Sequence, residues 1–204
     1  MDDSNELHEL VRLTKAGNHE AFGELYEKTI KQVNQTVHFL VEHPSDREDV
    51  IQEAYIGLHK SLGNYDINRP FKPWLMGIVI KQVNTYRRKR WMTFRIINKK
   101  SQEPMDTVES DVAIQFQEKL IQRELIEEIK NLSYKLKQVV ILHYLNEYTQ
   151  EEVAKILNIP IGTVKSRINA ALKKLREKKK PTLQVRKVEA IHELRTAHSQ
   201  RTSE

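Results

Sequence analysis

TQEEVAKILNIPIGTVKSRINAALKKLREKKK, residues 149–180, predicts two helices joined by a tight turn. Thr149 and Glu152 have the spacing of a capping box, in which a hydroxyl and a carboxylate satisfy backbone amides at a helix start. Asn158 tolerates the left-handed conformation that ends a helix, and Pro160 has the φ angle that suits the first position of the next one. The stretch therefore predicts a helix-turn-helix.

The second helix of this stretch has an apolar side and a cationic side. Four apolar residues recur at i, i+4, i+7 and i+11 and predict one buried stripe: Val164, Ile168, Ala171 and Leu175. The opposite face carries Lys165, Ser166, Asn169 and Lys173. This arrangement suits a recognition helix in a DNA major groove, whereas the ordinary alternative is an amphipathic hairpin with a solvated charged face. Because the capping, the turn residue and the single-sign outer face agree, we favour DNA binding.

The composition favours an all-α protein of the cytoplasm. The 204 residues are enough for one large or two small domains with buried cores. The absence of cysteine excludes disulfides, thiolate zinc sites and cysteine redox sensing, and it fits a reducing compartment. No signal-peptide pattern follows Met1, and no apolar run reaches the ~20 residues that span a bilayer. The 6 glycines and the scarcity of alternating β-type patterns predict a mostly helical fold.

The net charge of +6 is divided between acidic and basic blocks. Residues 1–68 hold 6 Lys/Arg and 13 Asp/Glu, whereas residues 69–100 hold 10 Lys/Arg and no Asp/Glu. Residues 101–131 hold 3 Lys/Arg and 8 Asp/Glu, and residues 132–204 hold 15 and 7. Two basic blocks separated by acidic ones predict two surfaces that meet phosphates, with acidic surfaces left for a protein partner.

Hydrophobic periodicity predicts three helices in the first acidic block. They cover residues 5–15, residues 18–41 and a stretch after Pro44, where Ser45 and Glu48 have capping-box spacing. The third helix has an acidic outer face over its first half, which consists of Asp46, Glu48, Asp49, Gln52 and Glu53, with Ile56 beside it. On the residues alone, a protein-docking face and a solvated face are equally good interpretations.

The basic block that follows combines aromatic and cationic side chains. Pro73 as a first helical position predicts a helix from there to about Arg90. The aromatic residues Tyr65, Phe71, Trp74, Trp91 and Phe94 are interleaved with Arg69, Lys72, Arg87, Arg90 and Arg95. Rings and cations together suit single-stranded nucleic acid. For Phe71 and Trp74 a core role is equally good, whereas for the run 87–90 we favour phosphate contact over a solvated helix end.

The domain organisation follows from a break in periodicity. Residues 96–116 gather Ser, Pro, Asp and Glu and predict a flexible linker between a first domain over residues 1–95 and a second over residues 117–180. In the second domain, a helix over about 116–131 and another capped by Ser133 are expected to pack on the helix-turn-helix. The basic tail over residues 181–204 is predicted to be a marginal helix or disordered, and we assign it no function.

The sequence contains no pattern for catalysis or for a metal site. There is no Gly-rich phosphate loop, no GxSxG and no HExxH. His143, in an apolar helix, is predicted to be a packed core histidine. We therefore expect no enzymatic activity, no catalytic residue, no metal, no cofactor and no small-molecule substrate.

With both halves described, the chain resembles the extracytoplasmic-function (ECF) group of bacterial sigma-70 family sigma factors. The matching segments are DREDVIQEAYIGLHKSL (46–62), RPFKPWLMGIVIKQVNTYRRKR (69–90) and LSYKLKQVVILHYLNEYTQEEVAKILNIPIGTVKSRINAALKKL (132–175). The resemblance covers most of the chain and implies a sigma factor that binds core RNA polymerase, through its β′ clamp and β subunit, and promoter DNA. It also implies an anti-sigma factor as a further partner.

The resemblance assigns family roles to positions of this chain. The helix at 46–62 would contact the β′ clamp, through Asp49, Gln52, Glu53 and Ile56. The segment 65–90 would bind and open the promoter −10 element, through Tyr65, Trp74, Asn84, Arg87, Arg88 and Lys89. The helix from Gly162 would read the −35 element, with Lys165, Ser166 and Asn169 toward bases and Thr163, Arg167 and Lys173 toward phosphates.

Three features depart from the family pattern, and two other functional classes compete with it. Family members often carry Gly and Ser where this chain has Asn158 and Pro160. Ala170 stands where Arg is frequent, so a different −35 preference is expected, and the tail has no counterpart. A stand-alone helix-turn-helix regulator would explain residues 123–180 but leave the first 92 without a role. A single-strand-binding protein would explain residues 65–100 but leave the recognition helix unexplained.

Overall fold

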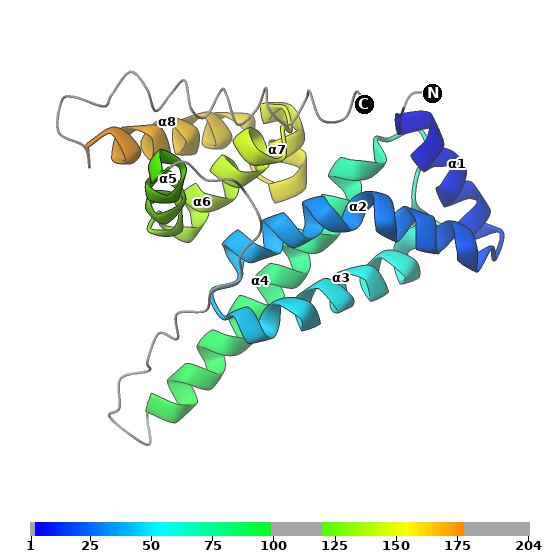
Figure 1. Ribbon diagram of the computed structural model, residues 1–204, viewed down its shortest axis with the longest axis horizontal. Coiled ribbons are helices and arrows are strands. Elements are labelled where there is room, and N and C mark those ends of the chain that lie inside the picture. Colours follow the sequence, from blue (N-terminus) through cyan, green and yellow to red (C-terminus); the bar gives the residue numbers. More distant parts are fainter. Residues whose placement is uncertain (1–2, 99–119, 178–204) are drawn as a thin grey trace. The chain divides into compact units, whose positions relative to one another are not determined.

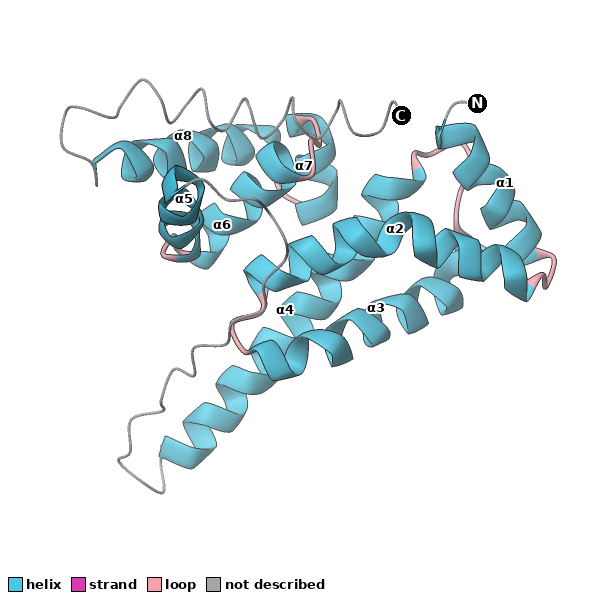
Figure 2. Cartoon of the chain, viewed as in Figure 1, coloured by secondary structure: helices cyan, strands magenta, loops and turns pink. Residues whose placement is uncertain are grey.

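The computed structural model describes residues 3–98 and 120–177, and within these ranges it contains helices and turns without a strand (Figures 1 and 2). The chain divides into two compact units, residues 1–110 and 111–204, and each is described by itself. The predicted all-helical, two-domain fold is confirmed. Nearly all of the predicted linker and the whole of the predicted tail lie outside the described residues.

The described residues of the first unit, 3–98, form four helices. They are α1 (Asp3–Lys15), α2 (His19–Leu40), α3 (Arg47–Ser61) and α4 (Phe71–Asn98), with short 3₁₀ turns η1 (Pro44–Asp46) and η2 (Leu62–Asn64) at the two ends of α3. Helices α2, α3 and α4 pack against one another, and α1 packs on α2 (Figure 1). Leu25, Leu58 and Val79 have no exposed surface, and each such side chain contributes about 1.5–3 kcal/mol to stability by leaving water.

The ends of α1 and α2 follow the local signals, but the start of α3 does not. Gly17 has a φ of +93°, which suits its place after α1, and the side chain of Asn18 accepts a hydrogen bond from Ala21 N at 3.1 Å. The predicted capping box of Ser45 and Glu48 is wrong. Because Pro44 opens η1, the helix begins only at Arg47, and the Ser45 hydroxyl donates to Asp46 Oδ1 at 3.1 Å instead.

Helix α4 is longer than predicted at both ends. It begins at Phe71, two residues before Pro73, and continues to Asn98 instead of ending near Arg90. Pro73 fits there because backbone amides in the first turn of a helix have no intrahelical partner. Side chains of α4 pack closely on Gly57 of α3, where an added Cβ would lie 3.2 Å from Gln82 Nε2.

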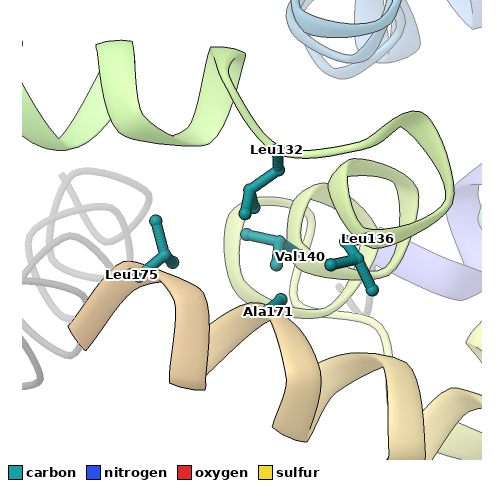
Figure 3. Close-up of a cluster of buried hydrophobic side chains, with 5 residues drawn as sticks. All are labelled: Leu132, Leu136, Val140, Ala171 and Leu175. Carbon is teal, nitrogen blue, oxygen red and sulfur yellow. The ribbon is translucent and has the colours of Figure 1, made fainter. Parts of the chain in front are cut away.

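The second unit is built around α8. Its elements are α5 (Leu120–Lys130), α6 (Tyr134–Val140) with a π-helical turn η3 (Ile141–Leu145), α7 (Gln150–Leu157) and α8 (Ile161–Glu177). A buried cluster joins α6 and the turn before it to α8 and consists of Leu132, Leu136, Val140, Ala171 and Leu175 (Figure 3). All four apolar residues of the predicted α8 stripe are buried, which confirms the predicted inner face.

The predicted helix-turn-helix signals are observed almost as expected. Thr149 and Glu152 form a complete capping box at the start of α7. Asn158 ends α7 in the left-handed conformation, with φ 51° and ψ 53°. Pro160 is not the first residue of α8 but directly precedes it, and its carbonyl accepts from Val164 N at 3.2 Å. Ser133 precedes α6 as predicted, although its side chain makes no capping bond.

Candidate nucleic-acid and protein-binding surfaces

Helix α8 presents a cationic and polar face to solvent. Lys165, Ser166, Asn169 and Lys173 are exposed on it, whereas Thr163 and Arg167 are half-buried at its edge. The Ser166 hydroxyl donates to the Thr163 carbonyl at 3.0 Å, and Lys173 lies 3.7 Å from the carboxylate of Glu177. Because both members of this ion pair are well exposed, the pair contributes little and a phosphate can compete for the lysine.

The turn before α8 fixes how this face is presented. The left-handed Asn158 lets Ile159 N bond to the carbonyl of Ala154 at 3.0 Å, and the Pro160 carbonyl receives the first amides of α8. Buried Val153 and Ile156 from α7, together with Val164 from α8, belong to the core of the unit. The exposed face of α8 is therefore held by the buried core of the unit and by the backbone hydrogen bonds at the end of α7 and the start of α8.

The second candidate surface lies on α3 and is acidic. Asp49, Gln52, Glu53 and Ile56 are all exposed, and Ile56 keeps 45% of its surface in solvent. They lie opposite the buried residues Val50, Ala54 and Leu58. A row of carboxylates around an exposed apolar side chain is a plausible protein-docking surface, although one exposed isoleucine is unremarkable by itself.

Asp46 was predicted as part of the acidic outer face, but it binds α4 instead. Its Oδ2 accepts hydrogen bonds from the Tyr86 hydroxyl at 2.8 Å and from Arg90 Nη1 at 3.1 Å. The hydrogen bond from Tyr86, supported by Ser45 and Arg90, lowers the pKa of the Asp46 carboxyl. Burial, with the same hydrogen bond, raises the pKa of Tyr86 to about 12. Asp46, Tyr86 and Arg90, which we call the α4 clasp, fix the start of α3 to the middle of α4.

The basic run at residues 87–90 is divided between internal and outward-facing cations. Arg87 Nη1 lies 3.0 Å from Glu42 Oε1, and Arg90 belongs to the α4 clasp. Arg88 and Lys89 are exposed, as is Asn84 one turn before Arg88. The sequence pattern treated the run as one phosphate-binding block, because it does not tell which cations find carboxylates in the fold. Asn84, Arg88 and Lys89 are therefore the outward members of the predicted −10 set.

The two aromatic residues of the predicted −10 set, Tyr65 and Trp74, pack within the first unit and do not point freely into solvent. Tyr65 is only 4% exposed, and its ring centroid lies 4.5 Å from that of half-buried Trp74 and 5.6 Å from that of Phe71. The Tyr65 hydroxyl donates to the carbonyl of Arg69, and burial raises its pKa to about 12. In this conformation Tyr65 anchors the loop 65–70, and Trp74 is the more accessible ring.

Helix α1 also holds this loop, which the sequence reasoning missed. Lys15 Nζ donates to the Tyr65 carbonyl at 3.4 Å, and His8 Nε2 lies 3.2 Å from the Arg69 carbonyl, to which it donates. Nothing in the local pattern of α1 predicts contacts that lie 50 and 61 positions away along the chain. The loop 65–70, which precedes the basic helix α4, is thus held in place by α1.

Other chemistry is not apparent in the described part of the chain. Within it, no group of three or more His, Cys, Asp or Glu side chains is arranged to hold a metal ion. None of its helices combines the length and hydropathy that a bilayer span requires. His143 is half-buried, and its Nδ1 donates to the carbonyl of Tyr148 at 2.8 Å, as befits a packed histidine.

Comparison with known proteins gives one family for both units. The model of sigma-70 region 2 matches residues 25–93, and the model of sigma-70 region 4 matches residues 122–175. The ECF RNA polymerase sigma factor SigW of Bacillus subtilis (strain 168) is 27% identical over 176 residues, which are 82% of this chain and 93% of the relative.

Two solved structures share the fold. One is CnrH in complex with the cytosolic domain of CnrY, with a TM-score of 0.60 and 21% identity over 83% of this chain and 94% of that chain. The other is the sigma factor RpoE in complex with the anti-sigma factor NepR from Bartonella quintana, with a TM-score of 0.65 and 20% identity over 76% of this chain and 94% of that chain.

Proposed function

The chain belongs to the extracytoplasmic-function group of sigma-70 family sigma factors, and on this basis we propose that it uses three surfaces to bind core RNA polymerase and the two promoter elements. Sigma factors are promoter-recognising initiation factors without an enzymatic reaction of their own. The observation that carries the proposal is the order of the two matches, region 2 on the first unit and region 4 on the second. A stand-alone regulator leaves the first unit without a role.

The −35 element is assigned to α8. Exposed Lys165, Ser166 and Asn169 support base contacts, because short polar and cationic side chains on one helix face reach base edges in the major groove. Thr163, Arg167 and Lys173 flank that face and suit phosphates, which fix the register of a helix on the duplex. Ala170 is exposed on the same helix and offers no hydrogen bond, so the guanine contact of an arginine is absent there.

The −10 element is assigned to the first unit. Exposed Asn84, Arg88 and Lys89 on α4 are the direct contacts, and half-buried Trp74 is the most accessible of the three rings packed at the loop 65–70. Arg87 and Tyr65 retain their place in the set as residues that position α4 and the loop, since each is engaged within the unit. Such a surface suits single-stranded DNA, because unpaired bases stack on aromatic rings and the phosphates of the strand bind cations.

Core polymerase is assigned to the exposed face of α3. Asp49, Gln52 and Glu53 supply charge and hydrogen bonds, and Ile56 supplies an apolar contact for the β′ clamp. The acidic charge of this face suits a partner surface that is basic, and complementary charges speed the association of two proteins. The β subunit is the expected second contact of the bound chain, without assigned residues.

Transcription by reconstituted holoenzyme tests this function. Purified chain is added to sigma-free core polymerase, and run-off transcripts from genomic fragments are mapped. We expect a small set of start sites with shared −35 and −10 sequences. A chain that binds one operator tightly alone, and yields no transcript with core polymerase, would instead be a stand-alone helix-turn-helix regulator.

An anti-sigma factor is a further expected partner. Support comes from CnrH and RpoE, whose structures were solved in complex with the cytosolic domain of CnrY and with the anti-sigma factor NepR. A purified candidate anti-sigma protein should stop run-off transcription, and excess core polymerase should restore it. A candidate that stops transcription from an unrelated holoenzyme equally well would not be specific for this chain.

A further inference from the structure

The end of α4 carries exposed aromatic and apolar side chains that the assignments above leave without a partner. Trp91, Met92 and Phe94 keep 57%, 52% and 44% of their surfaces in solvent. This end of the helix extends beyond α2 and α3 in Figure 1, and every residue over 91–95 is exposed. An exposed tryptophan is the largest of these side chains, and it marks Trp91 as a candidate contact residue.

Trp91 lies on the same side of α4 as the outward −10 residues. Positions 84, 88, 91 and 95 follow one another at i, i+4, i+7 and i+11, so Asn84, Arg88, Trp91 and Arg95 form one row along the helix. All four are exposed. At 1.5 Å per residue, Trp91 lies about 10 Å and Arg95 about 16 Å beyond Asn84.

The charges around Trp91 favour a nucleic acid over a protein as the occupant. Residues 69–100 contain 10 Lys/Arg and no Asp/Glu, and the guanidinium of Arg95 lies 4.5 Å from the centroid of the Trp91 ring. Tryptophan, methionine and arginine also suit a protein interface, so the choice rests on the undivided positive charge of residues 69–100, which attracts phosphates and contains no carboxylate. A ring between two arginines provides both a stacking surface for a base and cations for the neighbouring phosphates.

We propose that Trp91 stacks on an unpaired promoter base next to the −10 element, while Arg88 and Arg95 hold the flanking phosphates. This inference rests on the proposed −10 role of α4 and extends it by about two turns. The family model of region 2 ends at residue 93, so Arg95 lies beyond the matched segment.

The test compares three variants in reconstituted holoenzyme on a fork-junction promoter whose non-template strand is unpaired from the −10 element onward. Trp91→Leu keeps an apolar helix former but removes the aromatic face, whereas Trp91→Phe keeps a ring. Met92→Ala truncates a neighbouring exposed side chain on a different side of the helix and is the control. We expect about 5- to 100-fold weaker binding for Trp91→Leu, from the usual strength of base stacking, and near wild-type binding for Trp91→Phe and Met92→Ala.

Abasic substitutions then locate the base. In the wild-type complex, one abasic position of the non-template strand should weaken binding, and that penalty should disappear in Trp91→Leu. Asn84→Ala should lose the penalty of a different position, because Asn84 lies about 10 Å away along α4. The stacking proposal would be overturned if Trp91→Leu and Trp91→Phe bound the promoter equally well. It would also be overturned if no abasic position had a penalty that disappears in Trp91→Leu.

The same experiment separates this inference from the function on which it rests. If Asn84→Ala weakens promoter binding and Trp91→Leu does not, the −10 role of α4 stands and the inference fails. If neither variant weakens binding, both fail. If Trp91→Leu weakens the affinity for core polymerase instead of DNA, the surface binds protein and the inference is wrong.

Discussion

Asn158 is the residue on which the geometry of the helix-turn-helix depends. It is one of two non-glycine residues with positive φ among those described, and it ends α7 where the chain turns toward α8. The left-handed conformation costs an ordinary L-residue about 1–2 kcal/mol, whereas asparagine and glycine adopt it readily. We expect Asn158→Ala to lower the free energy of unfolding by about 1 kcal/mol and Asn158→Gly to leave it nearly unchanged. Denaturant unfolding measures both, and equal losses would indicate that the side chain matters by another contact.

Lys165 offers a test of base reading by a single side chain. It is exposed near the start of α8, where a recognition helix meets base edges, whereas exposed Lys174 lies away from that face. We expect Lys165→Ala to change the preferred base at one −35 position. The free-energy difference by which the wild-type chain favours its present base over others there should fall by about 1–3 kcal/mol. Selection of randomised −35 sequences by holoenzyme measures this. Lys174→Ala should lower affinity evenly or not at all, and the same change of preference in both variants would refute the assignment.

At the scale of residues, local signals were predictable and long-range pairings were not. Thr149, Glu152 and Asn158 act within four positions of themselves, so their roles can be inferred from spacing. On α2 the aromatic Tyr26 is 37% exposed, whereas the polar Thr29 is buried and its hydroxyl lies 2.9 Å from that of Tyr55. Helical periodicity selects apolar residues and therefore misses a polar side chain that finds its partner on another helix.

Among the elements, α4 is the one whose orientation the rest of its unit controls. The α4 clasp attaches its middle to the junction before α3, and the ion pair between Glu42 and Arg87 adds a second attachment. Gly57 of α3 allows close packing nearer the start of α4. These attachments hold the backbone of α4 on both sides of Arg88.

The α4 clasp predicts a pH-dependent contribution to stability. The pKa of Asp46 is lowered in the folded state, so its contribution is present above the ordinary value of 3.8 and is lost as pH falls through the folded-state pKa. We expect Asp46→Asn to destabilise the first unit by about 1 kcal/mol at pH 7, allowing for the partial exposure of the side chain. The difference from wild type should shrink below about pH 4.

Unfolding by denaturant across this pH range measures the effect, with Glu53→Gln as control. That substitution removes a carboxylate from an exposed position of α3, the helix that Asp46 precedes, where no tyrosine or arginine bond to it is observed. Its effect at neutral pH should be small. A loss for Asp46→Asn that stays constant into acid would mean that packing, and not the charge, is responsible.

At the scale of elements, the sequence predicted the helices better than their ends. The apolar period of α2 and α3 gave the inner faces, but the start of α3 depended on the 3₁₀ turn that Pro44 opens. The end of α4 was predicted near Arg90. The helix instead continues to Asn98, and this extension exposes Trp91.

For the whole molecule, the segregated charges separate three kinds of contact on one chain. The acidic face of α3 and the cationic faces of α4 and α8 lie on different elements, and two of these faces belong to one unit and the third to the other. The acidic residues of α3 and the cationic residues of α8 belong to different units, so either set can be changed without altering the side chains of the other. Binding to core polymerase and binding to the −35 element should be separable by mutation.

Reversing charge at Asp49 and Glu53 tests this separation. The two residues lie at i and i+4 on the exposed face of α3, so Asp49→Lys with Glu53→Lys places two cations where the β′ clamp is expected to meet carboxylates. We expect the affinity for core polymerase to fall about tenfold or more, since juxtaposed like charges cost several kcal/mol. Labelled chain titrated with core polymerase gives that affinity, and a duplex −35 fragment gives the DNA affinity.

The control must carry the same change in net charge, because added lysines strengthen the attraction to DNA phosphates wherever they stand. Glu20→Lys with Glu24→Lys provides it, since these residues are exposed on α2 at the same i and i+4 spacing in the same unit. Both double variants should bind the −35 fragment equally, and only the α3 variant should lose core polymerase. Equal loss in the two would mean that net charge, rather than a docking face on α3, governs association, and the assignment of α3 would fail.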